Sequence, residues 1–210
     1  SLRVSSAELG DTAVIIGLGL VGNFASQLFE LAGVRVISIE KVSKRLEIAK
    51  KCGIKYCINS ERENPIEKVM ELTNKQGAEV TVEAIGNPRL IEMAFQLTKR
   101  KGEVILLGSP RGEFITDVTN ILDYVHLISK GSITLKSAHE WVYPVMRSAD
   151  CKHSIERNTA IVYNLFKEGK LKSQELITHV INPSDAKSAY DGLVEKKDEY
   201  LGVVMDWTKI

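Results

Sequence analysis

A glycine-rich turn constrains this chain more than any other feature of its sequence. The apolar, β-branched run at residues 12–16 stops at Gly17-Leu18-Gly19-Leu20-Val21-Gly22, and apolar residues then recur at three- and four-residue spacing up to Leu31. A run without polar alternation is typical of a parallel strand buried on both faces, and the later spacing is typical of an amphipathic helix. The sequence therefore predicts a strand, a GxGxxG turn and a helix in direct succession.

Each glycine of this turn has its own physical role. Gly17 permits a tight turn, Gly19 lets the backbone approach a pyrophosphate, and Gly22 lets the helix pack closely on the strand. The N-terminal amides and the dipole of the helix face the phosphates in such an arrangement. The turn favours a dinucleotide-binding site, with an ordinary glycine turn or the glycine loop of a methyltransferase as the alternatives.

An acidic residue stands where such a site needs one. A second apolar run, residues 34–39, ends at Glu40, which follows Gly22 by 18 residues. An acidic side chain about 20 residues after the motif hydrogen-bonds a ribose 2′-hydroxyl, and it would repel a 2′-phosphate. Glu40 therefore favours NAD over NADP. The cations Lys41, Lys44 and Arg45 leave the choice open, since they could contact adenine, pair with Glu40 or remain solvated.

Strands and helices alternate along the first two thirds of the chain. Asn64-Pro65 and Asn87-Pro88 each place a cap residue before a proline that suits the first helical position. The predicted strands are 12–16, 34–39, 56–58, 80–84, 103–107 and 132–136, and the predicted helices are 21–31, 43–51, 65–73, 88–98 and 121–129. This alternation predicts an α/β fold with a doubly wound, six-stranded parallel Rossmann sheet.

The rhythm changes near Ala138. We expect helices at about 155–168 and 183–196 and strands at 176–181 and 202–205, which together form an α+β segment. The sequence therefore predicts two domains, residues 1–137 and residues 138–210.

The composition excludes several classes of partner. The 28 Lys and Arg residues balance 27 Asp and Glu residues, so no positive field attracts nucleic acid or anionic lipid. No run reaches the about 18 apolar residues of a membrane span, and the first six residues lack the apolar core of a signal peptide. We expect a cytoplasmic protein with no nucleic-acid or membrane partner.

A set of segments in a fixed order points to one family. The segments are GLGLVG, IEKVSKRLEIAKKCG, GAEVTVEAIGNP, GEVILLGSP and ELITHVINPSDA. Together they resemble the medium-chain, zinc-type alcohol dehydrogenase family, which includes sorbitol and threonine dehydrogenases, over nearly the whole chain. The resemblance implies reversible hydride transfer between NAD and a secondary alcohol or polyol, with zinc polarising the substrate oxygen. It also implies a homodimer or homotetramer that pairs through the strand at 132–136.

The resemblance assigns cofactor contacts residue by residue. It places Gly17, Gly19, Leu20, Val21 and Gly22 at the pyrophosphate, Glu40 on the adenosine ribose and Arg45 beside the adenosine. It places Ala84, Ile85 and Gly86, and Leu107, Gly108 and Ser109, along the ribose and nicotinamide.

The chain departs from the family because it lacks the family's zinc ligands. The family's zinc ligands and proton-relay hydroxyl belong to an N-terminal lobe, and no Cys or His of this chain matches a zinc ligand, so no catalytic or metal-binding residue is predicted. Residues 138–210 then correspond to the C-terminal portion of the catalytic lobe. Gly202 stands where the family often carries a Lys or Arg directed at the pyrophosphate. We expect that zinc belongs to the full-length parent only and that this chain alone is inactive.

Other polar and aromatic residues have structural interpretations. Cys52, Cys57 and Cys151 form no CxxC pair, which predicts reduced structural cysteines. The four histidines (His126, His139, His153 and His179) are expected to be structural. The two tryptophans (Trp141 and Trp207) are expected to pack in a core or at a lobe boundary rather than to line a substrate site. The alternatives for function are an NADPH-dependent quinone or enone reductase of the same superfamily and a non-catalytic NAD-sensing module.

Overall fold

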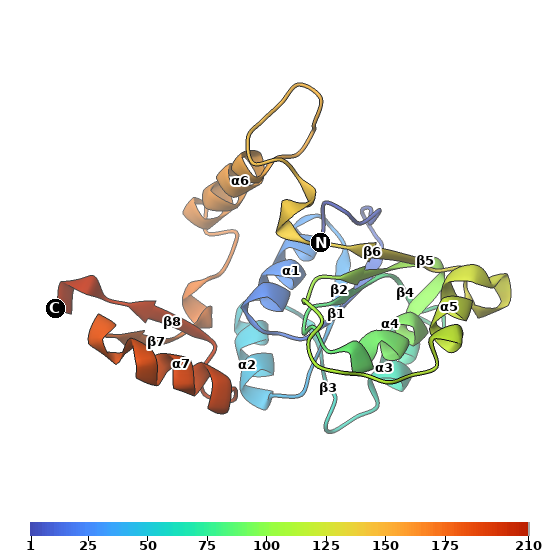
Figure 1. The fold of residues 1–210 in the computed structure, drawn as a ribbon, viewed down its shortest axis with the longest axis horizontal. Helices are drawn as coiled ribbons and strands as arrows, with labels where there is room; N and C mark the ends of the chain where they lie inside the picture. The colour runs from blue at the N-terminus through green and yellow to red at the C-terminus, as the bar shows by residue number, and fades with distance from the viewer. Residues whose placement is uncertain (210) are drawn as a thin grey trace.

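A six-stranded parallel sheet forms the centre of the computed structural model, which describes residues 1–209 (Figure 1). Its strand order is β3-β2-β1-β4-β5-β6, and every neighbouring pair is parallel. The strands are β1 (Thr12–Ile16), β2 (Arg35–Glu40), β3 (Tyr56–Asn59), β4 (Ala78–Glu83), β5 (Thr98–Leu106) and β6 (Thr134–Ser137). The predicted doubly wound sheet is confirmed.

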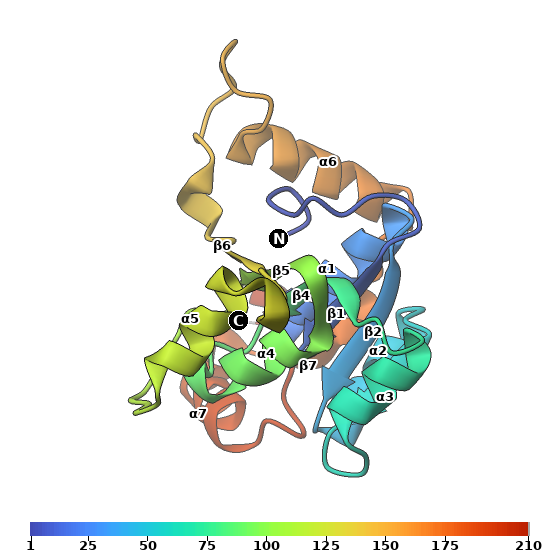
Figure 2. The ribbon, with the colours of Figure 1, turned by 90° about the vertical axis from the view of Figure 1, so that its right-hand side faces the viewer.

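Helices cover both faces of this sheet. They are α1 (Leu20–Leu31), α2 (Ser43–Lys51), α3 (Pro65–Leu72), α4 (Ile91–Leu97) and α5 (Val118–His126). Short 3-10 turns flank them: η1 (Pro88–Leu90) precedes α4 and η2 (Ile128–Lys130) follows α5. Viewed from the side, α4 and α5 lie on one side of the sheet, whereas α6 (Ile155–Lys167) stands apart from it (Figure 2).

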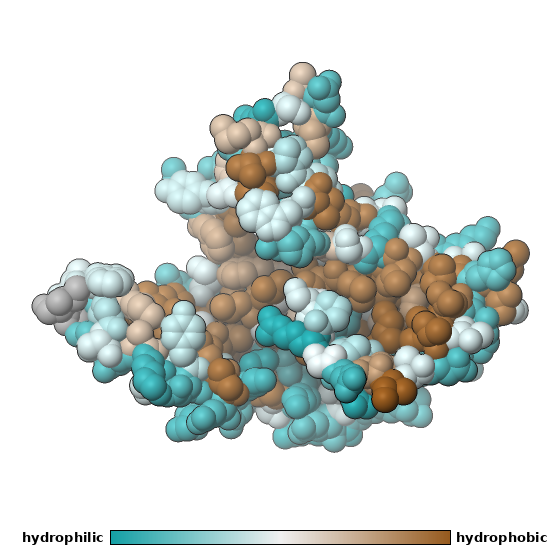
Figure 3. Space-filling view, viewed as in Figure 1, coloured by the Kyte–Doolittle hydropathy of each residue, from teal (hydrophilic) through white to brown (hydrophobic). Residues whose placement is uncertain are grey.

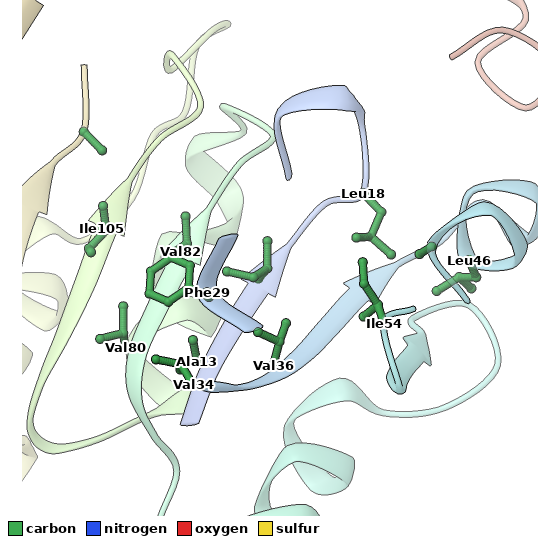
Figure 4. Packing of buried hydrophobic residues seen from close by; sticks show 13 residues of the cluster. Ala13, Leu18, Phe29, Val34, Val36, Leu46, Ile54, Val80, Val82 and Ile105 are labelled. Carbon is green, nitrogen blue, oxygen red and sulfur yellow. The ribbon is translucent and has the colours of Figure 1, made fainter. Parts of the chain in front are cut away.

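Two apolar cores lie on opposite faces of the sheet. The first contains Phe29 of α1 and Leu46 of α2, which pack against inward-facing residues of the strands (Figure 4). The second contains Val69 of α3 and Phe95 of α4, with Tyr124 of α5 stacked on the Phe95 ring at 5.2 Å. Because both faces are covered, the central strand β1 carries apolar residues on both sides, as the sequence predicts. The other strands also contain polar residues, such as Thr81 in β4 and Lys99 in β5.

The strand order reverses between β1 and β4. From β1 the chain proceeds to β2 and β3 on one side, and β4, β5 and β6 lie on the other side. In a doubly wound sheet, ligands bind at this reversal, outside the carboxyl ends of the strands. From the topology we therefore expect a ligand site at the turns that follow β1, β2, β4 and β5.

Most boundaries lie within a few residues of the sequence prediction, and the shifted starts of α5 and β5 have identifiable causes. The helix α5 starts at Val118, three residues earlier than predicted, because the Asp117 side chain accepts a hydrogen bond from Thr119 N and caps it. The strand β5 starts at Thr98, five residues earlier than predicted, since Thr98 already pairs with Ala78. The register then shifts, and Lys101 adopts a left-handed φ of 60° before pairing resumes at Glu103.

Residues beyond β6 form a separate unit on the α1 and α2 side of the sheet (Figure 1). It contains η3 (Glu140–Val142), α6, η4 (Gln174–Leu176), β7 (Ile177–Ile181), η5 (Pro183–Asp185), α7 (Ala186–Glu195), β8 (Gly202–Met205) and η6 (Trp207–Lys209). The strands β7 and β8 form their own two-stranded parallel sheet. A Cβ on Gly202 would collide with the Leu176 carbonyl, so the position leaves no room for a Lys or Arg.

His179 is a packing residue, as predicted. Its ring stacks on Tyr200 at 3.8 Å, and its Nδ1 atom lies 2.9 Å from the Thr178 hydroxyl. Thr178 in turn donates to the Gly202 carbonyl and accepts from Leu201 N. These contacts join the two strands of the small sheet.

Of the two places predicted for the tryptophans, a core and a lobe boundary, the structure rules out a core for both. Trp141 and Trp207 are 63% and 67% exposed. His126 and His139 are exposed as well, and the His139 Nδ1 atom accepts a hydrogen bond from Trp141 N at the start of η3, which is a structural contact. Apolar side chains gather across the middle of the face in Figure 3, and part of the apolar surface of this chain is therefore not buried within it.

Candidate functional site

The glycine turn joins the end of β1 to the start of α1. Gly17 adopts a left-handed φ of 95°, and a side chain there would collide with Ile85. A Cβ on Gly22 would collide with the Gly17 carbonyl, so the helix passes too close for any side chain. Gly19 differs, because nothing lies within 4 Å of an added Cβ. The turn is therefore tightly packed at Gly17 and Gly22 and open at Gly19.

The start of α1 lies at this opening. Gly19 is the N-cap residue, and no side chain among residues 1–209 caps the helix. The first amides of an α-helix have no partner within the helix, and the dipole makes this end positive. Leu20 and Val21 are 39% and 57% exposed here. An uncapped, exposed helix N-terminus beside an open glycine suits the phosphate groups of a ligand.

Glu40 connects the glycine turn to the turn after β2. It is only 5% exposed. Its Oε2 atom accepts a hydrogen bond of 2.9 Å from Leu18 N, and its Oε1 atom accepts from the amides of Lys41 and Val42 at 2.8 and 3.0 Å. The carboxylate therefore holds the ends of β1 and β2 together through three backbone amides.

One acceptor position of Glu40 remains. An ionised carboxylate offers about four acceptor positions, and the three amides occupy both of those on Oε1 and one on Oε2. The Nη1 atom of Arg45 lies 3.7 Å from Oε2, while the buried Nε atom of Arg45 has no hydrogen-bond partner in the described structure. Within the described structure, Glu40 thus keeps one acceptor position, and Arg45 one donor, without a hydrogen-bond partner.

The sequence analysis missed a second buried carboxylate, Glu83 at the end of β4. It is 2% exposed, and its oxygens accept hydrogen bonds from the amides of Ile85 and Gly86 at 2.8 to 3.0 Å. Burial raises the pKa of the Glu83 carboxyl above its ordinary value, although the amide hydrogen bonds act in the opposite direction. No spacing from the glycine motif marks Glu83 in the sequence, because its role depends on the conformation of the turn that follows it.

The turns after β4 and β5 pack backbone against backbone. A Cβ on Gly86 would collide with the Ser109 carbonyl, and one on Gly108 would collide with the Gly86 amide. The side chain of Ile85, 52% exposed, lies over Gly17 of the glycine turn. The three turns after β1, β4 and β5 therefore meet at one place.

The predicted site residues do not all face outward. Gly17, Glu40, Arg45, Ile85, Gly86, Gly108 and Ser109 lie in or against the turns at the carboxyl ends of the strands. Ala84 and Leu107, in contrast, are half-buried and pack on the first apolar core. These two residues support the turns rather than line an opening.

The described residues do not suit a metal ion. Within residues 1–209, no group of three or more His, Cys, Asp and Glu side chains is close enough to hold one. The Cys151 thiol donates a hydrogen bond to the His153 carbonyl. Burial raises the pKa of the Cys52 and Cys57 thiols to about 11, which disfavours the thiolate that binds metals. None of the helices in this range has the length and apolarity of a membrane span.

Residues 21–149, more than half of the chain, match the family model described as zinc-binding dehydrogenase. The chain belongs to this family. L-threonine 3-dehydrogenase of Bacillus velezensis is 27% identical over 188 residues, which cover 89% of this chain and 49% of that enzyme. The dehydrogenase family thus accounts for the sequence from the glycine turn into the linker beyond β6.

Solved dehydrogenases share the fold. Alcohol dehydrogenase TADH from Thermus sp. ATN1 superposes with a TM-score of 0.76 at 21% identity, covering 97% of this chain and 53% of that one. The alcohol dehydrogenase rspB from E. coli CFT073, solved with its cofactor NADH, superposes with a TM-score of 0.73 at 18% identity, covering 97% and 54%. The chain spans about half the length of the dehydrogenases it matches.

Proposed function

We propose that residues 1–137 form an NAD-binding domain whose site lies at the carboxyl ends of β1, β2, β4 and β5. The observation that carries this proposal is the open space at Gly19 beside the uncapped N-terminus of α1. The pyrophosphate lies at Gly19, Leu20 and Val21, where backbone amides and the helix dipole offset its charge. The NADH complex of the structural relative rspB supports the same cofactor class.

Glu40 sets the cofactor preference in this proposal. The remaining acceptor position on its Oε2 atom receives the adenosine 2′-hydroxyl, while its negative charge repels a 2′-phosphate. Arg45 lies beside the adenosine. Further along, Ile85 and Ser109 border the ribose and nicotinamide at the turns after β4 and β5.

The parent reaction follows from the family. NAD supplies the chemistry of hydride transfer, and we propose a secondary alcohol or polyol as the substrate. The residues of this chain bind and orient the cofactor, and residues 138–210 belong to the lobe that contacts the substrate. We further propose that this chain by itself does not oxidise alcohols, because none of its cysteines and histidines matches a zinc ligand of the family. A cytoplasmic location and a homodimer or homotetramer complete the proposal.

Titration with NAD and NADP, followed by calorimetry, tests the cofactor preference. NAD should bind more tightly than NADP. The variant Glu40→Gln should bind NAD about threefold to tenfold more weakly, because it loses a hydrogen bond to a charged acceptor. It should also reduce the difference between the NAD and NADP affinities, because it loses the charge that repels the 2′-phosphate. Glu47→Gln, an exposed position on α2, is the matched control and should leave both affinities unchanged. Tighter binding of NADP to the unmodified chain would contradict the preference.

A further inference from the structure

The unit that contains β7 and β8 has a small contact with the rest of the molecule. The buried residues that join it to α1 and α2 form one cluster: Ile48, Cys52, Leu176 and Leu201, with Phe24 packed against them. The two cores of the main sheet contain 13 and 12 buried apolar residues. Hydrophobic stabilisation scales with buried apolar area, so the small contact opens at a lower free-energy cost than the sheet unfolds.

This contact is also incomplete. A cleft of about 400 Å³ lies between α2 and the C-terminal unit, with Lys44 and Lys51 on one side and His179 and Glu199 on the other. Near Cys52, the Glu175 Oε2 atom is buried and has no hydrogen-bond partner in the described structure, and the buried Asn23 Nδ2 atom there has only the weak acceptor Cys52 Sγ beside it. Buried polar atoms without partners reduce the stability of the closed contact.

One side chain joins the two parts by a specific pair of hydrogen bonds. Gln27 of α1 is 4% exposed, and its Nε2 atom donates to the Lys172 carbonyl at 3.0 Å. The Lys172 amide donates back to the Gln27 Oε1 atom at 2.7 Å. The Gln27 amide also donates to Asn23 Oδ1 at 2.8 Å, which fixes its orientation. Gln27 therefore binds the backbone 145 residues away much as a neighbouring strand would.

Cys52 lies beneath this contact. It is 7% exposed, and Leu176 and Leu201 of the C-terminal unit belong to the same apolar cluster. Cys57 belongs to a different environment, since it packs on the first core of the main sheet. Burial raises the pKa of both thiols to about 11. The two cysteines therefore distinguish release of the C-terminal unit from unfolding of the sheet.

We propose that residues 171–205 act as a releasable lid on α1 and α2, and that Gln27 is the residue that latches it. Release breaks the Gln27–Lys172 pair and the four-residue cluster while the six-stranded sheet stays folded. The residue that holds the lid, Gln27, thus belongs to α1, the helix that starts at the glycine turn. This inference rests on the contacts of the lid and does not depend on cofactor binding.

Alkylation of each cysteine by iodoacetamide, followed by peptide mass spectrometry without cofactor, tests the lid. The variant Gln27→Met keeps the volume and removes both hydrogen bonds to Lys172, so Cys52 should react about tenfold faster while Cys57 stays unchanged. Gln96→Met is the matched control, because Gln96 also lies on a helix but its side chain only contacts the exposed Glu92. It should leave both rates unchanged.

A second variant changes the lid instead of α1. Leu201→Ala removes apolar area from the lid and should also accelerate Cys52 alone. Two results would overturn the proposal: an unchanged Cys52 rate in both variants, or equal acceleration of Cys52 and Cys57, which signals global unfolding. Neither result bears on NAD binding, because the assay contains no cofactor.

Discussion

At the residue scale, Glu40 and Glu83 have a common role. Each ends a strand, turns inward and accepts hydrogen bonds from the backbone amides of a turn that contains glycine. The spacing from the glycine motif identifies Glu40 in the sequence. Glu83 escapes sequence reasoning, because its role depends on which amides the turn after β4 directs at its side chain. The same limit applies to Gln27, whose partner Lys172 is remote in sequence.

Because burial raises the pKa of Glu83, its ionisation reduces the stability of the folded chain. The raised pKa means that the favourable contribution is complete below the ordinary pKa of a glutamate and is lost as the pH rises through the folded value. The free energy of unfolding of the unmodified chain, compared with that of Glu83→Gln, should therefore fall as the pH rises above 4.5, the ordinary pKa of the group. Urea titrations at several pH values measure this difference. Glu47→Gln should show no such trend, and a difference that grows with pH would contradict the assignment.

At the element scale, local signals determined most of the predicted boundaries. Three Asn-Pro pairs begin helical turns, and in each the Asn side chain accepts a hydrogen bond from a following amide, as Asn64 does from Ile66 N. The starts of α5 and β5, which both lie earlier than predicted, have different causes. The start of α5 depends on the Asp117 cap, which is a local signal that the analysis overlooked. The start of β5 depends on the pairing of Thr98 with Ala78, which is a tertiary contact and has no local signal.

The strand β6 carries the prediction about assembly. It is the last strand of the sheet, and Leu135 on it is 41% exposed. An unpaired apolar edge promotes pairing with a second copy, so we expect a dimer or tetramer in light scattering at tens of micromolar. Leu135→Lys should shift the population towards monomer, whereas Val194→Lys, at an exposed apolar position on α7, should not. A monomeric unmodified chain at that concentration would contradict the prediction.

At the scale of the whole molecule, one sheet places all the turns of the proposed site together, and a smaller unit rests on α1 and α2 beside it. The alternation of strands and helices predicts this sheet, since each element has its own apolar pattern. The contact between the two units has no such pattern. It includes one small apolar cluster, the T-shaped ring pair Phe24–Phe166 and the two hydrogen bonds between Gln27 and Lys172.

Binding of NAD to a Gly19→Val variant is the most direct test of the central claim, that the glycine turn holds a dinucleotide. Gly19 has a φ of −61°, which valine tolerates, and nothing lies within 4 Å of an added Cβ. The variant should therefore unfold at the same temperature as the unmodified chain and bind NAD at least about tenfold more weakly, because the new side chain fills the space of the pyrophosphate. Ala32→Val, at the exposed other end of α1, should change neither quantity. If Gly19→Val binds NAD as well as the unmodified chain does, or if the unmodified chain binds none, the proposed site is wrong.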